Sequence, residues 1–167
     1  MNDRRVLRRM GPAFSPREVE GKPDAALLRV TVVSSRWNPT VTDGLLATAL
    51  AALAERGARE ENVTVVRVPG AFELPAAARL ALGNARCDAV VVLGAIVRGE
   101  TFHHDVLAHA VGSALAALSA ETGRPVGFGL LTCDTLDQAH ARMGKGAEAA
   151  EAAVEMANLR RRLRARR

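Results

Sequence analysis

Short apolar runs alternate with longer segments of helical periodicity along most of this chain. Runs rich in β-branched residues predict strands over 27–33, 63–68, 89–93 and 126–132. Apolar residues three or four positions apart predict helices over 41–56, from 74 to about 83, from 101 to 123, over 136–142 and from 147 onward. Because helix-length connections separate successive strands, right-handed crossovers should make the strands parallel. We therefore predict an α/β fold: a flavodoxin-like three-layer α/β/α sandwich with a four-stranded parallel sheet in the order 2-1-3-4.

The alternating pattern does not extend to the two ends of the chain. Residues 1–26 are rich in Arg, Pro and Glu and show no periodicity, so we expect a flexible N-terminal arm. Residues 27–159 hold all the predicted elements without an internal repeat, and residues 160–167 form a basic C-terminal tail. With 167 residues in total, the chain is long enough for one domain with a sizeable core.

The basic character of the chain is concentrated in these two ends. Residues 1–10 and 160–167 together hold ten arginines and one aspartate, whereas the rest carries 13 basic and 17 acidic side chains, a net charge of −4. With no Tyr and one Trp, the chain has no interleaving of aromatic and basic residues, so we expect no specific nucleic-acid surface. Solvated tails, with at most nonspecific binding to polyanions at low salt, are the better interpretation.

Other features of the sequence indicate a cytoplasmic protein. No apolar run approaches 18 residues, and the N-terminus has arginines without an apolar segment, so we expect neither a membrane span nor a secretory signal. Cys87 and Cys133 are the only cysteines, and they lack the CxxC spacing of a redox or metal motif, which predicts reduced thiols.

The stretch 88–105, DAVVVLGAIVRGETFHHD, has the most informative pattern. A buried strand is expected to end at Gly94, a second glycine follows at Gly99, and Thr101 is a candidate N-cap for a helix with two histidines in its first turn. The spacing resembles a phosphate-binding loop, but Glu100 stands where a nucleoside triphosphatase needs Lys and would repel a triphosphate, so we exclude that activity. A smaller phosphate, held by backbone N–H groups and Thr101, remains compatible with the loop.

Polar residues follow the first three predicted strands, at 35–38, 70–73 and 98–103. In open parallel sheets, ligands bind outside the carboxyl ends of the strands, so these segments should share one site. Trp37 is either a core residue or a platform for a ligand ring. Glu73 is either a partner of a helix dipole or a ligand contact.

The two histidines at 103 and 104 are either helix-cap residues or candidate proton carriers. No metal site is expected, because their helical i+4 partners are Leu107 and Ala108. The residues by themselves therefore predict a small-molecule site with an anion pocket, an aromatic face and a candidate proton carrier.

Four blocks of the sequence carry a resemblance to a known family. They are SRWN at 35–38, VPGAFELP at 68–75, LGAIVRGET at 93–101 with His two positions further on, and KGAEAAEAAVEMANL at 145–159. In order and spacing these blocks are similar to those of lumazine synthases, enzymes of the penultimate step of riboflavin biosynthesis. The resemblance runs from about residue 30 to residue 159 and marks 27–159 as the catalytic domain.

The resemblance implies a cofactor-free condensation of 5-amino-6-(D-ribitylamino)uracil with 3,4-dihydroxy-2-butanone 4-phosphate. The products would be 6,7-dimethyl-8-ribityllumazine, phosphate and water. It also implies a homo-oligomer, a pentamer or a multiple of pentamers, with each site at a subunit interface. Riboflavin synthase is a candidate protein partner.

The resemblance also implies roles for individual residues. His103 would be the proton-transfer residue, with His104 as a competing candidate. The substrate-binding residues would be Trp37 on the pyrimidine ring, Asn38, Ala71, Phe72 and Glu73 at the ribityl chain, Ala95, Ile96 and Val97 at the pyrimidine edge, Gly99, Glu100, Thr101 and Arg142 at the phosphate, and Phe128 and Lys145 from the neighbouring subunit.

Two other classes of function stay open at this stage. A catalytically weak lumazine- or flavin-binding or shell-forming paralogue would keep the same motifs without productive turnover. A flavodoxin-like regulatory module would be expected to carry an acidic phosphate acceptor at the end of the first strand, where this chain has Ser34 and Ser35.

Overall fold

The computed structural model describes residues 16–165, and its centre is one parallel sheet. The strands are β1 (Val30–Ser35), β2 (Val63–Val68), β3 (Ala89–Val97) and β4 (Val126–Cys133). They pair in the order β2-β1-β3-β4, which confirms the predicted order. The central strand β3 is buried along nearly its whole length, as expected for a strand covered on both faces.

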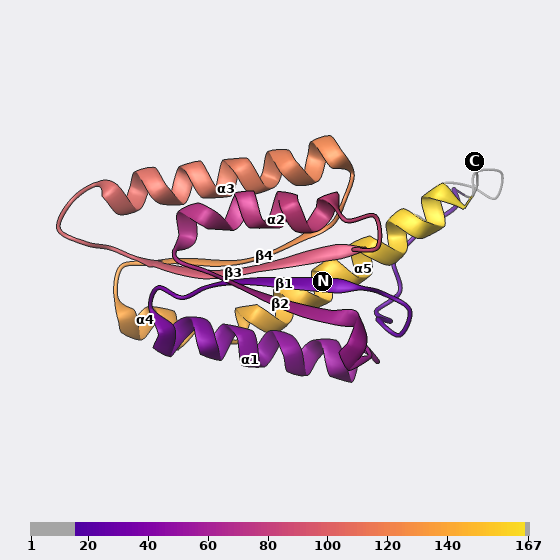
Figure 1. Cartoon of the computed structure of the whole chain (residues 1–167), viewed down its shortest axis with the longest axis horizontal. Helices are drawn as coiled ribbons and strands as arrows, with labels where there is room; N and C mark the ends of the chain where they lie inside the picture. The colour runs from indigo at the N-terminus through magenta and orange to yellow at the C-terminus, as the bar shows by residue number, and fades with distance from the viewer. Residues whose placement is uncertain (1–15, 166–167) are drawn as a thin grey trace.

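Helices cover both faces of the sheet, so the predicted three-layer sandwich is confirmed (Figure 1). The helices are α1 (Pro39–Glu55), α2 (Leu74–Gly83), α3 (His103–Thr122), α4 (Leu136–His140) and α5 (Lys145–Arg164), with short 3₁₀ turns η2 (Glu60–Asn62) and η3 (Ala71–Glu73). α2 and α3 lie on one face, and α1, α4 and α5 lie on the other (Figure 1). No helix in residues 16–165 has both the length and the apolar character needed to cross a bilayer.

Successive residues of the central strands alternate between two hydrophobic cores. Val32 and Val91 pack with α1 and α5, whereas Val33 and Val92 pack with α2 and α3. Strand geometry explains this alternation, because neighbouring side chains point to opposite faces of a sheet.

The β3–α3 connection differs from the sequence-based prediction at both ends. β3 does not end at Gly94 but continues to Val97. A Cβ on Gly94 would lie 2.8 Å from Leu130 and 3.0 Å from Leu74, so this glycine makes room for close packing and does not break the strand. α3 begins at His103 after Phe102, so Thr101 is not its N-cap.

Smaller differences occur at other element boundaries. β1 begins at Val30, three residues later than expected, and α1 begins at Pro39, two residues earlier than expected, where the fixed φ of proline suits the first helical turn. α4 ends at His140. α5 begins at Lys145, which therefore lies in the first turn of the helix and not in the loop before it.

The expected basic tail is the last part of α5 as far as Arg164. Arg161 in this part forms an ion pair of 3.0 Å with Asp88 and donates a hydrogen bond of 3.0 Å to the carbonyl of Leu27. The helix extends beyond the end of the sheet (Figure 1). Residues 160–164 are therefore an ordered helix end that is tied to the sheet.

The C-terminal part of the expected N-terminal arm packs against α5. Asn158 donates hydrogen bonds of 2.8 and 2.7 Å to the carbonyls of Lys22 and Asp24, and Ala25 is fully buried. Residues 1–15 of the arm lie outside the described residues. The described part thus differs from a solvated arm, because it is held along the last helix.

Two glycines allow α5 to approach its neighbours closely. A Cβ on Gly146 would lie 2.0 Å from the carbonyl oxygen of Leu45 in α1, and a Cβ on Gly127 would lie 2.1 Å from the carbonyl oxygen of Ala149. α5 therefore packs backbone to backbone against both α1 and β4. This contact leaves no room for a side chain at either glycine.

Candidate active site

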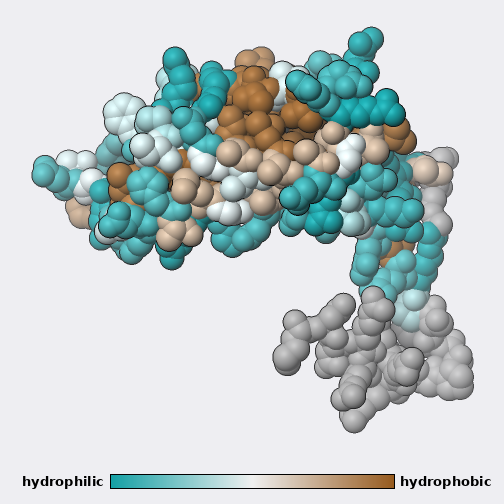
Figure 2. All heavy atoms as spheres, turned by 90° about the horizontal axis from the view of Figure 1, so that it is seen from below, coloured by the Kyte–Doolittle hydropathy of each residue, from teal (hydrophilic) through white to brown (hydrophobic). Residues whose placement is uncertain are grey.

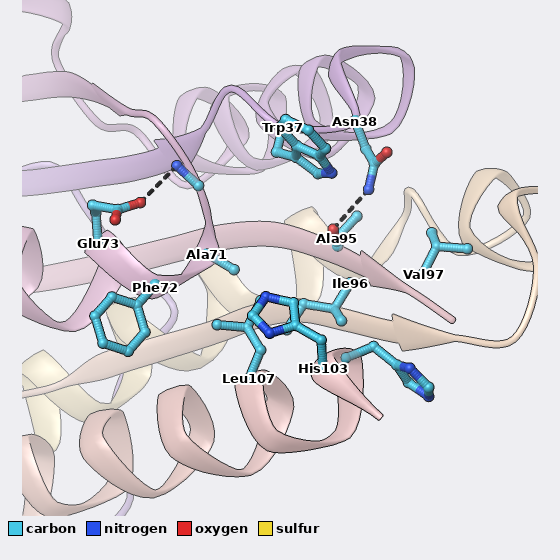
Figure 3. Close-up of a pocket in the computed structure, with 12 residues that line it drawn as sticks. Trp37, Asn38, Ala71, Phe72, Glu73, Ala95, Ile96, Val97, His103 and Leu107 are labelled. Carbon is cyan, nitrogen blue, oxygen red and sulfur yellow. Dashed lines mark hydrogen bonds between the residues drawn. The ribbon is translucent and has the colours of Figure 1, made fainter. Parts of the chain in front are cut away.

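A cavity of about 370 Å³ lies at the carboxyl ends of β1, β2 and β3. Three loops and the first turns of α3 surround it (Figure 3). Its lining residues are Trp37, Asn38, Gly70, Ala71, Phe72, Glu73, Ala95, Ile96, Val97, His103, His104 and Leu107. The structure thus brings together the polar segments that follow the first three strands.

The loop after β1 presents an aromatic ring beside the cavity. Asn38 adopts the left-handed conformation with φ 58°, which asparagine tolerates better than most residues. Its side-chain amide donates a hydrogen bond of 2.9 Å to the carbonyl of Ala95 at the end of β3. This bond fixes the loop across two strands, and the preceding Trp37 stays 71% exposed at the cavity.

The turn after β2 contributes a carboxylate. The backbone N–H of Gly70 donates a hydrogen bond of 2.9 Å to Oε2 of Glu73, which fixes the η3 turn. Ala71 is buried, whereas Phe72 remains 67% exposed. The second carboxylate oxygen of Glu73 is available to a ligand, so its local role does not exclude a binding role.

The end of β3 offers backbone groups to the cavity. β1 pairs with β3 only as far as Ser34 and Leu93, whereas β4 pairs with it as far as Val97 and Cys133. Residues 95–97 of β3 therefore have no pairing partner in β1. Because strand backbone groups alternate in direction, Val97 should present its N–H and C=O to the same side as Ala95.

α3 places two histidines at the cavity with different surroundings. Nδ1 of His104 lies 2.8 Å from the carbonyl oxygen of Thr101, and its Nε2 lies 3.3 Å from Asp105. Since a carbonyl only accepts hydrogen bonds, Nδ1 of His104 carries a proton. Within the described residues, His103 has no such side-chain partner, and with Leu107 it faces Trp37 and Asn38 across the cavity (Figure 3).

The predicted phosphate loop lies next to this cavity and does not line it. Gly99, Glu100 and Thr101 are exposed between β3 and α3. Arg98 holds the start of the loop through its N–H, which bonds the carbonyl of Cys133 at 2.9 Å, and through an ion pair of 2.8 Å with Asp134.

Three other predicted site residues lie outside the cavity of their own chain. Phe128 on β4 is 54% exposed and lines a different hollow beside α3. Arg142 follows α4 and donates a hydrogen bond of 2.9 Å to the carbonyl of Gln138. Lys145 pairs with Glu148 at 2.6 Å. The structure of one chain does not bring these three residues to Trp37 and His103.

Two lining residues were not among the predicted site residues. Leu107 lies one helical turn after His103, so its i, i+4 spacing was the available signal. Gly70 lies in the segment 70–73 that was expected at the site, but no role was predicted for it; it contributes through its backbone N–H.

A cavity outside the carboxyl ends of a parallel sheet, with two aromatic side chains, one carboxylate and two imidazole groups, defines an α/β protein that acts on a small molecule. The family model described as 6,7-dimethyl-8-ribityllumazine synthase matches residues 27–161. The chain belongs to this family.

Curated relatives extend over most of the chain. A 6,7-dimethyl-8-ribityllumazine synthase of Kocuria rhizophila is 52% identical over 141 residues, which cover 80% of this chain and 88% of the relative. The enzyme of that name from Kosmotoga olearia is 44% identical and covers 89% of this chain and 99% of the relative. The one from Thermotoga maritima is 45% identical, with 87% and 92% covered.

Proposed function

We propose that this protein condenses 5-amino-6-(D-ribitylamino)uracil with 3,4-dihydroxy-2-butanone 4-phosphate to give 6,7-dimethyl-8-ribityllumazine, phosphate and water. The observation that carries the proposal is the single cavity in which Trp37, Glu73 and His103 meet, in a chain of the lumazine synthase family. These side chains come from the loop after β1, the η3 turn and the first turn of α3, and would supply a ring platform, a hydroxyl acceptor and a proton carrier.

The cavity wall suits the pyrimidine substrate. Trp37 stacks on the heterocyclic ring, and the backbone of Ala95–Val97 bonds the polar ring edge beyond the last pairing with β1. Glu73 accepts hydrogen bonds from ribityl hydroxyl groups through the oxygen not used by Gly70. Asn38 uses its amide N–H on Ala95 and keeps its amide oxygen for the ribityl chain.

His103 moves the protons of the reaction. The substrate amine adds to the ketone and loses water, and phosphate leaves the four-carbon unit; each step requires a proton to be delivered or removed. An imidazole can do both near neutral pH. Holding the two substrates next to each other contributes further acceleration, because it replaces an encounter in solution.

The phosphate is bound at the start of α3. Backbone N–H groups of 99–101 and the positive end of the helix dipole favour an anion there. The guanidinium of Arg142 from a neighbouring subunit completes the phosphate site, and Phe128 and Lys145 of that neighbour close the pocket.

Turnover tests this function directly. Both substrates should be incubated with the protein, and the absorbance and fluorescence of the lumazine should be followed over time. We expect product to form well above the uncatalysed rate. Tight lumazine binding with no rate above background would instead identify the catalytically weak binder.

We also propose that the protein works as a pentamer or a multiple of pentamers in the cytoplasm, with riboflavin synthase as a candidate partner. Large apolar side chains are widely exposed, including Leu80 at 80%, Phe102 at 83% and Val106 at 66%. One face shows a hydrophobic cluster within a mostly hydrophilic surface (Figure 2). The edge strand β2 is also largely exposed, which favours coverage by a neighbour.

A shared site predicts complementation between two inactive variants. His103→Ala and Arg142→Ala would damage opposite sides of each subunit interface. In hybrid rings made by co-expression at equal levels, roughly a quarter of the interfaces should join two intact faces, and activity should return in about that proportion. Hybrids confirmed by native mass spectrometry but no more active than either parent would contradict the shared site.

Trp37 provides an optical test of the pocket. It is the only tryptophan of the chain and is exposed at the cavity. Titration with the lumazine product or riboflavin should quench tryptophan emission in a saturable way, because the ligand ring stacks on the indole. Unchanged emission at a saturating ligand concentration, with binding confirmed by equilibrium dialysis, would place Trp37 outside the binding pocket.

A further inference from the structure

A second groove lies at the opposite end of the sheet from the candidate active site. It has a volume of about 460 Å³ and runs between the end of α3, the turn before β4 and the last three turns of α5. Its lining residues are Ser119, Ala120, Gly123, Arg124, Pro125, Met156, Leu159, Arg160, Leu163 and Arg164. None of them lines the cavity that holds Trp37 and His103.

The floor of this groove is apolar and partly open to solvent. Met156, Leu159 and Leu163 recur at helical spacing and form one stripe along α5. Met156 is 52% exposed and Leu163 is 55% exposed. Covering this stripe would remove apolar surface from water, which is favourable.

Three arginines surround this floor, and none of them forms an ion pair within the part of the chain that the structure describes. The Nε atoms of Arg124 and Arg160 are buried without a hydrogen-bond acceptor within residues 16–165. The only hydrogen bond that the Arg124 guanidinium makes within residues 16–165 is a long one of 3.5 Å to the carbonyl of Asn84. Buried donors without acceptors are unfavourable, so an added acceptor would stabilise the cluster.

The positive charges of the cluster also repel one another. Burial, and then the neighbouring Arg164 and Arg124, lower the pKa of the Arg160 guanidinium. Asp88 acts in the opposite direction, but it already pairs with Arg161 at 3.0 Å and accepts the N–H of Arg29 at 2.9 Å. The groove thus keeps an excess of positive charge beside an apolar floor.

We propose that this groove binds a small amphipathic anion, a molecule with a phosphate, sulfonate or carboxylate group on an apolar body. The guanidinium groups of Arg124, Arg160 and Arg164 would bind the anionic group through charge-assisted hydrogen bonds. The stripe on α5 would contact the apolar body. The volume of the groove lies within the range typical of small-molecule sites.

The experiment uses 8-anilinonaphthalene-1-sulfonate as the probe, with the full chain in its native assembly and the lumazine product present to occupy the active site. Saturable fluorescence enhancement is expected. Arg160→Gln and Arg124→Gln should each weaken probe binding about tenfold, because each removes a charged hydrogen-bond donor. The control variant Arg59→Gln changes an exposed arginine between α1 and η2 that does not line the groove, and it should bind the probe like the wild type.

A substitution that supplies an acceptor provides an independent test. Met156→Glu places a carboxylate one helical turn before Arg160. This variant should lose the probe site, while its thermal unfolding midpoint stays at or above that of the wild type. A variant that loses both the probe and the folded circular-dichroism signal would not count as support, and the arginine variants would then decide.

Three results would overturn the proposal. The arginine variants could bind the probe as tightly as Arg59→Gln does. The uncharged analogue N-phenyl-1-naphthylamine could bind as tightly as the sulfonate, which would show a merely apolar surface. Probe binding could appear only after the assembly is dissociated, which would show that a second copy of the chain covers the groove.

Discussion

Replacing His103 by alanine should lower the rate of lumazine formation by about 10²-fold or less, the lower end of general acid–base contributions, because the condensation also proceeds slowly without a catalyst. The imidazole lines the cavity opposite Trp37 and Asn38, and no side-chain hydrogen bond within residues 16–165 restrains its ring. It is therefore available to exchange protons with the substrates. The loss should appear mainly in kcat, because the role proposed for His103 is proton transfer and not binding of either substrate.

His104→Ala is the matched control for this prediction. Its ring is hydrogen-bonded to the carbonyl of Thr101 and lies next to Asp105, so we expect it to stabilise the start of α3. We expect a much smaller effect on kcat and a modest loss of thermal stability. If His104→Ala had the larger kinetic effect, the proton-transfer role would belong to His104 and not to His103.

Gly146→Ala should destabilise the fold by about 1–3 kcal/mol, the usual range for an overpacked contact. The added Cβ would lie 2.0 Å from the carbonyl oxygen of Leu45 and 2.5 Å from the hydroxyl of Thr48. Leu45 lies in the middle of α1, so its carbonyl cannot move without displacing the helix. α5 would have to shift away from α1, and contacts of α5 with β4 would weaken as well.

Chemical denaturation measures this effect against a matched glycine. Gly83→Ala lies in the last turn of α2 with no atom within 4 Å of the added Cβ, so its stability should stay the same or rise by up to about 1 kcal/mol. If Gly146→Ala were as stable as Gly83→Ala, the α1–α5 contact would be shown to relax. In that case the close approach of α5 to α1 would not require a glycine at position 146.

The pattern of the sequence predicted the sheet because its cause is local. Short β-branched runs predicted the four strands, of which β1 and β3 are the buried central pair, and the handedness of crossovers restricted their order. The predicted end of β3 was wrong. The role of Gly94 depends on its contacts with Leu74 and Leu130, which are distant from it in the sequence. The N-cap of α3 was also placed one residue early, at Thr101.

The candidate site likewise has a part that the sequence could predict and a part that it could not. Strand ends meet at one edge of a parallel sheet, so sequence alone could place Trp37, Glu73 and His103 together, and the structure does so. Phe128 and Arg142 lie elsewhere in the chain, and a single sequence carries no direct record of how copies approach one another. The groove at the end of α5 was missed because a run of arginines resembles a solvated tail.

Hydrogen bonds between the first described residues and α5 hold the two ends of the described chain close together. Arg162 donates to the carbonyl of Glu20, and Asn158 donates to those of Lys22 and Asp24. A short linker could therefore join position 20 to position 162. The chain could then begin at Gly57, in the turn before β2, without moving the edge of the sheet that holds the candidate active site. Such a permutant would let a fused domain emerge beside β2 and not beside the end of α5.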